Sequence, residues 1–417
     1  MTLNSVLSSQ LDHRLESIPT GIERVVLAFS GGVDSCVLAH LLISHSRPFN
    51  ILLWHVNHGI QDTADEMEAF SRSIARLYNL PVEVSHLNLH ANMANLESEA
   101  REERYALFEQ ALTTDDCLLT AHHADDQVET LFLNILRGSG SAGLRGIAHS
   151  RPIGESILLR PLLDVSRAEI TGYALHHKLE WFDDPSNLSQ RFNRNYLRHE
   201  VIPRIKSRWP GYLDSVRSVV SIQVETQQVL EELATQDYLL AQRHSEQEIS
   251  NLLCRKTLQE FSQPRQKNLI RYWLKKYNCA NMPQSRLNEL IRQLNASGDS
   301  LPVISSSGYE IRTYNHHLYI VKQIIAVPAE KTYDFKRSTI LKVNEIDLKI
   351  DRKMIFKHLM KKDNGQSIKI KFRLNENESN ADIHRLKRLF QKHKIPPWKR
   401  SITPQLYLDN KLTGLWF

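Results

Sequence analysis

Apolar, strand-like runs alternate with amphipathic, helix-like segments from Gly21 to about Leu163. The strand-like runs occupy residues 25–29, 51–56, 82–87 and 117–120. Apolar residues recur at helical spacing between these runs, near residues 35–44, 65–78, 95–112 and 125–136. Strands joined by crossover helices form parallel sheets. The alternation therefore predicts an α/β fold with a doubly wound parallel sheet, in which ligands bind at the carboxyl ends of the strands.

The first strand-like run ends in the loop Ser30-Gly31-Gly32-Val33-Asp34-Ser35, and a helical pattern follows at once. Glycines let the backbone approach a phosphate, and a helix N-terminus presents free N–H groups and the positive end of its dipole. The spacing matches neither the Walker pattern nor GxGxxG. The loop resembles the SGGxDS loop of the N-type ATP pyrophosphatases, which cleave ATP to AMP and pyrophosphate. A serine-glycine turn after a strand also occurs in many other folds.

Two histidines and three carboxylates follow the fourth strand-like run, in the segment Thr120-Ala121-His122-His123-Ala124-Asp125-Asp126-Gln127-Val128-Glu129. Carboxylates in the first turn of a helix are stabilised by its dipole, and that alone explains one of them. The functional alternative assigns one histidine to proton transfer or charge stabilisation and Asp126 to Mg²⁺. We favour the functional alternative, because so many ionisable groups gather where the phosphate loop also ends.

Three arginine-containing segments are candidate anion contacts. Arg101 and Arg104 lie three residues apart on one helical face, where salt bridges to neighbouring glutamates are the alternative. Arg137 begins a glycine-dense loop, which suits either a nucleotide contact or a plain connector. Arg194 and Arg198 belong to a series of arginines and asparagines that can face a phosphate backbone.

Basic residues are concentrated at the C-terminal end of the chain. Residues 331–417 hold 21 Lys and Arg against 9 Asp and Glu, whereas the rest of the chain holds 32 against 38. Such asymmetry indicates a polyanionic partner, although a solvated lysine-rich surface is the alternative. The basic candidates that accompany Trp398 are Arg385, Lys387, Arg388, Lys392, Lys394, Lys399 and Arg400.

The composition favours a reducing, cytoplasmic location. Four cysteines without a CxxC pair suit neither a disulfide framework nor a zinc or iron-sulfur site. We see no apolar run long enough to cross a membrane and no secretory signal. The 417 residues predict several domains. We expect a catalytic domain over 1–211, a helical domain over 212–325, and a small, basic α+β domain over 326–417.

Six motifs give a specific resemblance over about residues 22–210. They are SGGVDS, HVNHGI, ESEARxxRY, TAHHADDQVETLFLNILRGSGSAGLRG, RPLL and DDPSNxxxRFNRNYLR. Their order and spacing resemble those of the tRNA(Ile)-lysidine synthetase family, a branch of the PP-loop superfamily. A looser similarity extends to PRQKNLIRYWL in the middle of the chain and to HKIPPWKRSITPQLYLDNKL near its end.

The resemblance implies an ATP-dependent carbon–nitrogen ligase. It would join L-lysine to C2 of the wobble cytidine of a CAU-reading isoleucine tRNA, through an adenylated intermediate, with release of AMP and pyrophosphate. The implied ATP-binding residues are Ser30, Gly31, Gly32, Val33, Asp34 and Ser35. The implied catalytic residues are His122, Asp126, Asp34, Arg101 and Arg198, with Asp126 as a Mg²⁺ ligand. The implied tRNA contacts are Arg194, Arg137, Lys394, Lys399 and Arg400.

Two other functions remain open from the sequence. A tRNA thiolase would use the same loop, but it is expected to carry catalytic cysteine pairs, which this chain lacks. A non-catalytic RNA-binding protein would keep the loop and the basic end without needing the His-His-x-Asp-Asp cluster. The oligomeric state is also open, a homodimer being one alternative, and the lysine pocket is unassigned.

Overall fold

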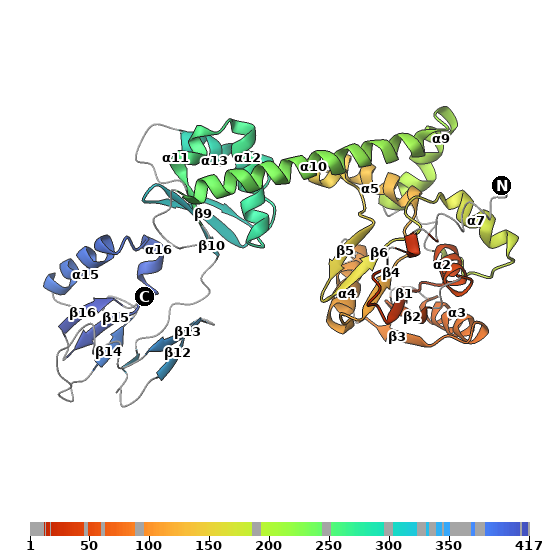
Figure 1. Cartoon of the computed structure of the whole chain (residues 1–417), viewed down its shortest axis with the longest axis horizontal. Helices are drawn as coiled ribbons and strands as arrows, with labels where there is room; N and C mark the ends of the chain where they lie inside the picture. The colour runs from red at the N-terminus through yellow and green to blue at the C-terminus, as the bar shows by residue number, and fades with distance from the viewer. Residues whose placement is uncertain are drawn as a thin grey trace. The chain divides into compact units, whose positions relative to one another are not determined.

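The computed structural model describes residues 12, 14–16, 18–45, 49–59, 63–87, 96–185, 193–243, 252–295, 303–322, 331–332, 339–343, 346–350, 368–371, 380–408 and 411–415. The chain forms two compact units, Met1–Val229 and Leu230–Phe417 (Figure 1). Among the described residues, no helix is both long and apolar enough to cross a membrane.

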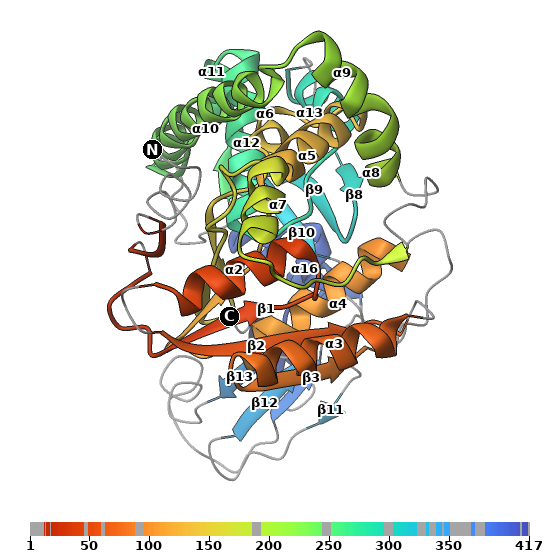
Figure 2. The same ribbon diagram turned by 90° about the vertical axis from the view of Figure 1, so that its right-hand side faces the viewer.

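The N-terminal unit is built on a six-stranded sheet with the order β3-β2-β1-β4-β6-β5. The strands are β1 (Arg24–Ala28), β2 (Asn50–Asn57), β3 (Val82–His86), β4 (Asp116–Leu119), β5 (Ser150–Ile153) and β6 (Ser156–Leu159). Figure 2 shows β1, β2 and β3 side by side. All neighbours pair in parallel except β5, which pairs antiparallel with β6 at the edge. The four predicted strands and their parallel arrangement are thus confirmed.

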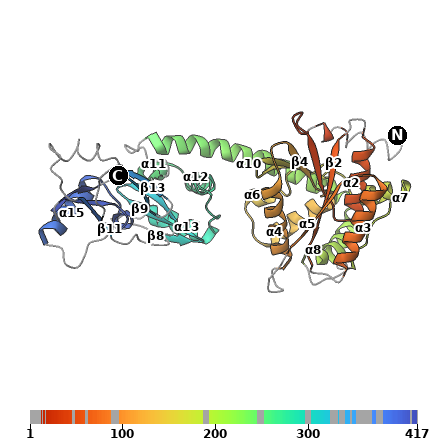
Figure 3. The ribbon, with the colours of Figure 1, turned by 90° about the horizontal axis from the view of Figure 1, so that it is seen from below.

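Crossover helices cover both faces of this sheet (Figure 3). Helices α2 (Val33–Ile43) and α3 (Ala64–Leu77) pack on one face, in a core that includes Leu38, Leu53 and Ile74. Helix α4 (Leu96–Ala111) packs on the other face, where Phe108 meets Trp54 edge-on with ring centres 5.0 Å apart. Because strands buried on both faces need apolar side chains in both directions, β1 reads as a continuous apolar run rather than an alternating one.

Helix α5 (Ala124–Leu136) continues from β4 and is followed by a second helical layer. This layer comprises α6 (Ser141–Leu144), α7 (Arg167–His176), α8 (Asn193–Tyr196), the π-helix η2 (Leu197–Val201), α9 (Ile202–Arg208) and the long helix α10 (Tyr212–Arg243). Val128 of α5, Leu197 of η2 and Tyr212 of α10 share one buried cluster. That packing brings residues near 125 and 195 together.

The first part of the second unit combines helices with an antiparallel sheet. Helices α11 (Arg255–Glu260), α12 (Gln263–Lys276) and α13 (Gln284–Asn295) accompany the sheet β7-β10-β9-β8. Its strands are β7 (Leu252–Cys254), β8 (Val303–Ser306), β9 (Tyr309–Tyr314) and β10 (His317–Lys322). The fully buried Trp273 of α12 lies in the shared core with Ile311 of β9.

The C-terminal part contains a four-stranded sheet, a two-stranded sheet and two helices. The four strands, in the order β11-β14-β15-β16, are β11 (Lys331–Thr332), β14 (Ile368–Lys371), β15 (Gln405–Leu408) and β16 (Lys411–Leu415). Strands β12 (Thr339–Val343) and β13 (Ile346–Ile350) pair with each other. Helices α15 (Asn380–Lys392) and α16 (Pro397–Arg400) complete this part. The predicted fold class, a parallel α/β sheet followed by helical and small α+β parts, is confirmed.

Candidate active site

The loop after β1 has the geometry of an anion cradle. The Ser35 hydroxyl donates to the Gly32 carbonyl oxygen at 2.9 Å, and the Ser30 and Ser35 hydroxyl oxygens lie 3.3 Å apart. Gly31 has φ +82°, and a Cβ on it would lie 3.2 Å from Cδ1 of Phe70. A glycine is therefore required at this position both for backbone conformation and for space. All six predicted ATP-binding residues lie in this loop or in the first turn of α2, whose free N–H groups face the same end.

Asp34 in the first turn of α2 is an acid whose pKa is raised by its surroundings. Burial raises the pKa of Asp34, and the negative charge of Asp126 adds to this effect while His123 opposes it. Its Oδ1 atom is buried and has no hydrogen-bond partner among the described residues. An unpartnered buried carboxylate oxygen beside a phosphate loop has the chemistry of a Mg²⁺ ligand.

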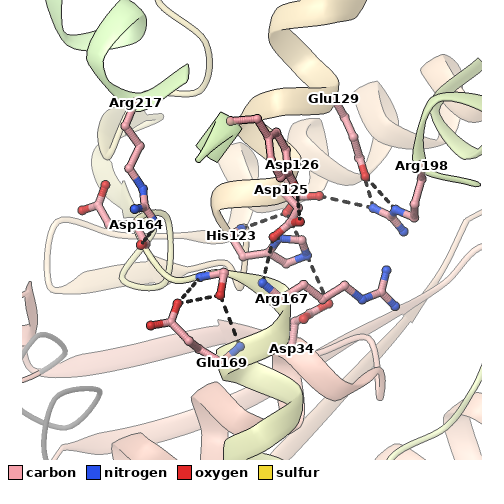
Figure 4. Close-up of polar contacts among 12 residues, drawn as sticks. Asp34, His123, Asp125, Asp126, Glu129, Asp164, Arg167, Glu169, Arg198 and Arg217 are labelled. Carbon is pink, nitrogen blue, oxygen red and sulfur yellow. Dashed lines mark hydrogen bonds and ion pairs between the residues drawn. The ribbon is translucent and has the colours of Figure 1, made fainter. Parts of the chain in front are cut away.

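His123 joins the loop acid to the acids of α5 (Figure 4). It is 2 % exposed, and its Nε2 atom lies 3.8 Å from Oδ2 of Asp34 and 3.6 Å from Oδ2 of Asp126. The backbone N–H of His123 donates to Oδ2 of Asp126 at 2.9 Å, which caps the start of α5. His123 thus takes part in the cap of α5, and it also connects the residues that follow β4 with those that follow β1.

Asp126 and Glu129 are held by two arginines from the α8–η2 segment. Arg194 donates to Oδ1 of Asp126 at 2.9 Å and to Oε2 of Glu129 at 2.5 Å. Arg198 donates to Oε1 and Oε2 of Glu129 at 2.6 and 3.0 Å, a two-pronged contact drawn in Figure 4. Burial raises the pKa of Asp126, but His123 and Arg194 outweigh it and the pKa falls to about 2. Asp126 is therefore ionised at neutral pH.

Asp125 lies with its Oδ2 atom 3.8 Å from Nδ1 of His123, and it also fixes the surrounding layer. Its Oδ2 accepts from the backbone N–H of Arg167 at 2.8 Å, and its Oδ1 accepts from the Tyr212 hydroxyl at 3.3 Å. Arg167 begins α7 and Tyr212 begins α10. Asp125 is thus an anchoring residue, which is the structural role that first-turn acids commonly have.

His122 points to Thr120, with Nδ1 of His122 2.9 Å from the threonine hydroxyl oxygen. The pKa of His122 is lowered to about 3. Burial is the main cause, the nearby charges of Arg160, Arg101 and Arg194 act in the same direction, and Asp126 opposes them. The imidazole is therefore neutral at physiological pH. It serves as a neutral donor or acceptor, and it does not contribute a positive charge to the site.

The structure brings only some of the predicted site residues together. Asp34, His122, Asp126 and Arg198 gather at the carboxyl edge of the sheet, and Arg101 on α4 is near enough to affect the pKa of His122. Arg137 is exposed at the end of α5. Lys394 is exposed in the second unit, whereas Arg400 is partly covered, with its guanidinium 5.6 Å from the Phe390 ring centre. Lys399 is also partly covered.

The structure also gives the contacts of two predicted residues. Trp398, predicted beside a basic RNA-binding surface, packs edge-on against Tyr319 of β10 with ring centres 5.2 Å apart. Oδ1 and Oδ2 of Asp126 each accept from an N–H donor, whereas Oδ1 of Asp34 has no such partner among the described residues.

His123 and Glu129 were not selected from the sequence, although both lie in the quoted motif. His123 is adjacent to His122, which was selected. The two side chains point in different directions and therefore contact different residues, which the sequence does not reveal. Glu129 carries a recognisable signal, because it lies three residues after Asp126 and therefore on the same face of α5. Its 1 % exposure shows that it is an inward-facing acid.

Comparison with known proteins gives three domain matches that follow one another along the chain. A PP-loop domain model matches residues 3–205, a TilS substrate binding domain model matches 253–319, and a TilS substrate C-terminal domain model matches 371–415. A tRNA(Ile)-lysidine synthase of Coxiella burnetii is 34% identical over 400 residues, covering 93% of this chain and 87% of the relative. The chain belongs to the tRNA(Ile)-lysidine synthase family.

Other matches agree with membership of the tRNA(Ile)-lysidine synthase family. A tRNA(Ile)-lysidine synthase of Photobacterium profundum is 32% identical over 431 residues, covering 99% of this chain and 95% of the relative. Among solved structures, the U34-tRNA thiolase NcsA from Methanococcus maripaludis has a TM-score of 0.44 and 18% identity, covering 53% of this chain and 80% of that one. The resemblance predicted from the six motifs is confirmed.

Proposed function

We propose that this chain is an ATP-dependent ligase that joins L-lysine to C2 of the wobble cytidine of a CAU-reading isoleucine tRNA. The observation that carries the proposal is the convergence of Asp34, from the phosphate loop, and Asp126, from α5, on the Nε2 atom of His123. Family membership over nearly the whole chain supports the same reaction. A non-catalytic RNA-binding protein has no need of a buried acid cluster at its nucleotide loop.

The proposed first step is adenylation of the cytosine. The O2 atom attacks the α-phosphate of ATP, a P–O bond forms, and the bond to the β-phosphate oxygen breaks to release pyrophosphate. Residues Ser30 to Ser35 hold the phosphates through backbone N–H groups and hydroxyls. The enzyme's task is to align the two reactants and to stabilise charge on the phosphate.

In the second step the ε-amine of lysine attacks C2, and the C2–O bond breaks to release AMP. The amine attacks in its neutral form, so a proton must leave the lysine ammonium. That proton passes to solvent, and the neutral imidazole of His122 can orient the amine through a hydrogen bond. We assign Arg194 and Arg198 to holding Asp126 and Glu129 in position, because their guanidinium groups are already paired there. Arg101 and Arg137 remain free to meet the tRNA.

Mg²⁺ fits this site through Asp34. Its buried Oδ1 lacks a hydrogen-bond partner among the described residues, and it lies on the helix whose N-terminus faces the phosphates. When bound, Mg²⁺ would neutralise charge on the ATP phosphates.

We assign tRNA binding to the rest of the chain and keep the division 1–211, 212–325 and 326–417 as part of the proposal. The matched substrate-binding and C-terminal models support this assignment. A tRNA substrate also implies action in the cytoplasm. A homodimer stays a prediction.

Mass spectrometry of nucleosides tests the proposed reaction. An unmodified CAU isoleucine tRNA transcript is incubated with the protein, ATP, Mg²⁺ and L-lysine and then digested. We expect lysidine together with AMP and pyrophosphate, and no lysidine from a transcript with a GAU anticodon. Asp34→Asn should release little pyrophosphate. A sulfur-containing cytidine, or tRNA binding without any new nucleoside, would show that another function is correct.

A further inference from the structure

Four arginines surround Tyr105, and the proposed reaction does not account for most of them. We call this group the arginine cluster: Arg101 and Arg104 of α4, Arg151 of β5, and Arg160, which follows β6. The guanidinium carbons of Arg151, Arg101 and Arg104 lie 4.7, 5.3 and 5.8 Å from the centre of the Tyr105 ring. Cations at this distance are attracted to the face of an aromatic ring.

The arginine cluster has no internal counter-charge. Within the part of the chain that the structure describes, none of its guanidinium groups pairs with a carboxylate. Arg160 is 4 % exposed, its Nη1 atom donates to the Ala148 carbonyl oxygen at 2.6 Å, and its Nε atom is buried without a hydrogen-bond partner among the same residues. Burial raises the pKa of Tyr105, but Arg101, Arg160 and Arg104 outweigh it and the pKa is lowered. Gathered positive charge without an acid is stabilised by a bound anion.

The arginine cluster lies at the catalytic edge of the sheet. Arg160 directly follows β6, and Leu159 pairs with Leu119, the last residue of β4 before the His122 segment. Arg160 and Arg101 both lower the pKa of His122, which places their charges near the imidazole. An anion held here would therefore be adjacent to the site of adenylation and on the α4 side of the sheet.

We propose that the arginine cluster binds a backbone phosphate of the tRNA substrate, with Arg101, Arg104 and Arg151 contacting the phosphate and Tyr105 acting as the positioning residue. This inference rests on the proposed function. Planar guanidinium groups match the oxygens of a phosphate with two parallel hydrogen bonds. The ATP phosphates already have a separate cradle in the Ser30–Ser35 loop, so the RNA backbone is the remaining phosphate source.

Arg151→Ala tests this inference directly. Arg151 is exposed, and its Nη1 atom donates only to the carbonyl oxygen of its neighbour Pro152 among the described residues, so the fold does not depend on this side chain. The matched control is Arg76→Ala, which removes one positive charge from an exposed position on α3, on the opposite face of the sheet. The Kd of the full-length protein for an unmodified CAU tRNA transcript is measured at several salt concentrations, and the Kd for ATP is measured in parallel.

We expect Arg151→Ala to weaken tRNA binding about tenfold and to reduce the slope of log K against log salt by about 0.7–0.9, the value for one phosphate contact. Arg76→Ala should stay within about twofold of wild type. Tyr105→Leu should weaken tRNA binding as Arg151→Ala does, whereas Tyr105→Phe retains the ring and should restore the affinity. The melting temperatures identify any variant that fails to fold.

Equal tRNA affinities and salt slopes for Arg151→Ala and Arg76→Ala would overturn the inference. A weaker ATP affinity with unchanged tRNA affinity would also overturn it, because the phosphate would then come from the nucleotide. Lysidine formation by the wild-type protein is followed in the same samples. Failure of the arginine cluster is thereby distinguished from failure of the proposed reaction.

Discussion

At the scale of single residues, charge compensation explains how acids, histidines and arginines can lie together in the active site. Glu129 is almost fully buried, yet both of its oxygens accept hydrogen bonds from arginines that are themselves about one fifth exposed. A buried carboxylate is tolerable only with such partners. His122 shows the opposite behaviour, because burial, together with the surrounding cations, lowers its pKa and keeps the imidazole neutral.

Replacing Glu129 with Gln tests this compensation. Glutamine keeps the shape but leaves Arg194 and Arg198 with one carboxylate between them. We expect the free energy of unfolding to fall by about 2 kcal/mol, less than for a fully buried pair because the arginines are partly solvated. Urea denaturation measures the change, with Glu109→Gln on the exposed side of α4 as the control. Equal stabilities of the two variants would contradict the role given to the ion pairs.

The protonation of His122 can be observed directly. With a pKa of about 3, its imidazole should stay neutral from pH 8 to pH 5. The unfolded chain takes up that proton below about pH 6.5, so His122 disfavours the folded state increasingly as the pH falls from about 6.5 to about 3. NMR titration of ¹⁵N-labelled histidine, assigned with His122→Gln, follows the ring. An inflection near pH 6.5 would show that burial and the arginines do not control it.

At the scale of elements, the sharp turn from β1 into α2 depends on one backbone conformation. Gly31 lies at φ +82° with Phe70 beside it, whereas Gly32 lies at φ −72° and has only Ser30 Oγ at 3.6 Å from a built Cβ. Neighbouring glycines in one motif thus carry different constraints. In α5, a single residue has two roles: Asp126 caps the helix N-terminus and also lies beside the His123 ring.

Alanine at these two positions separates the constraints. Gly31→Ala should lower the free energy of unfolding by more than about 1 kcal/mol and weaken ATP binding, because alanine is strained at positive φ. Gly32→Ala should have a much smaller effect on stability, since its backbone angles suit any residue. Thermal denaturation and ATP titration provide the two measurements. A Gly32→Ala protein that is as unstable as Gly31→Ala would refute the conformational argument.

At the scale of the whole molecule, the charge distribution divides the chain into an acidic majority and a basic end. The described part of that end presents Lys387, Lys392 and Lys394 as exposed side chains. By contrast, Arg400 donates to the Ile395 carbonyl oxygen at 3.2 Å and covers Phe390. Some basic residues of this end are therefore available to a polyanion, while others also stabilise the local fold.

Replacing Lys387, Lys392 and Lys394 together with Gln should weaken tRNA binding and flatten its salt dependence. Each lost phosphate contact reduces the slope by about 0.7–0.9, so three contacts give a reduction of about 2.1–2.7. The control replaces Arg76, Lys178 and Arg286 with Gln, an equal change of charge at exposed positions elsewhere. Fluorescence anisotropy with a labelled tRNA measures both. Identical slopes for the two triple variants would mean that the basic end is a solvated surface.

Local sequence determined the elements of the N-terminal unit and the identity of its phosphate loop. Strand runs, helical periodicity and the Ser30–Ser35 motif depend on neighbours in the chain, so their positions follow from the residues themselves. The six motifs likewise sufficed to indicate the family. Tertiary structure alone decided which side chains meet. Arg194 reaches Glu129 across 65 positions, and His123 rather than His122 faces Asp34. Those contacts depend on how α5, η2 and α10 pack, and side-chain direction in a packed core is set by distant residues.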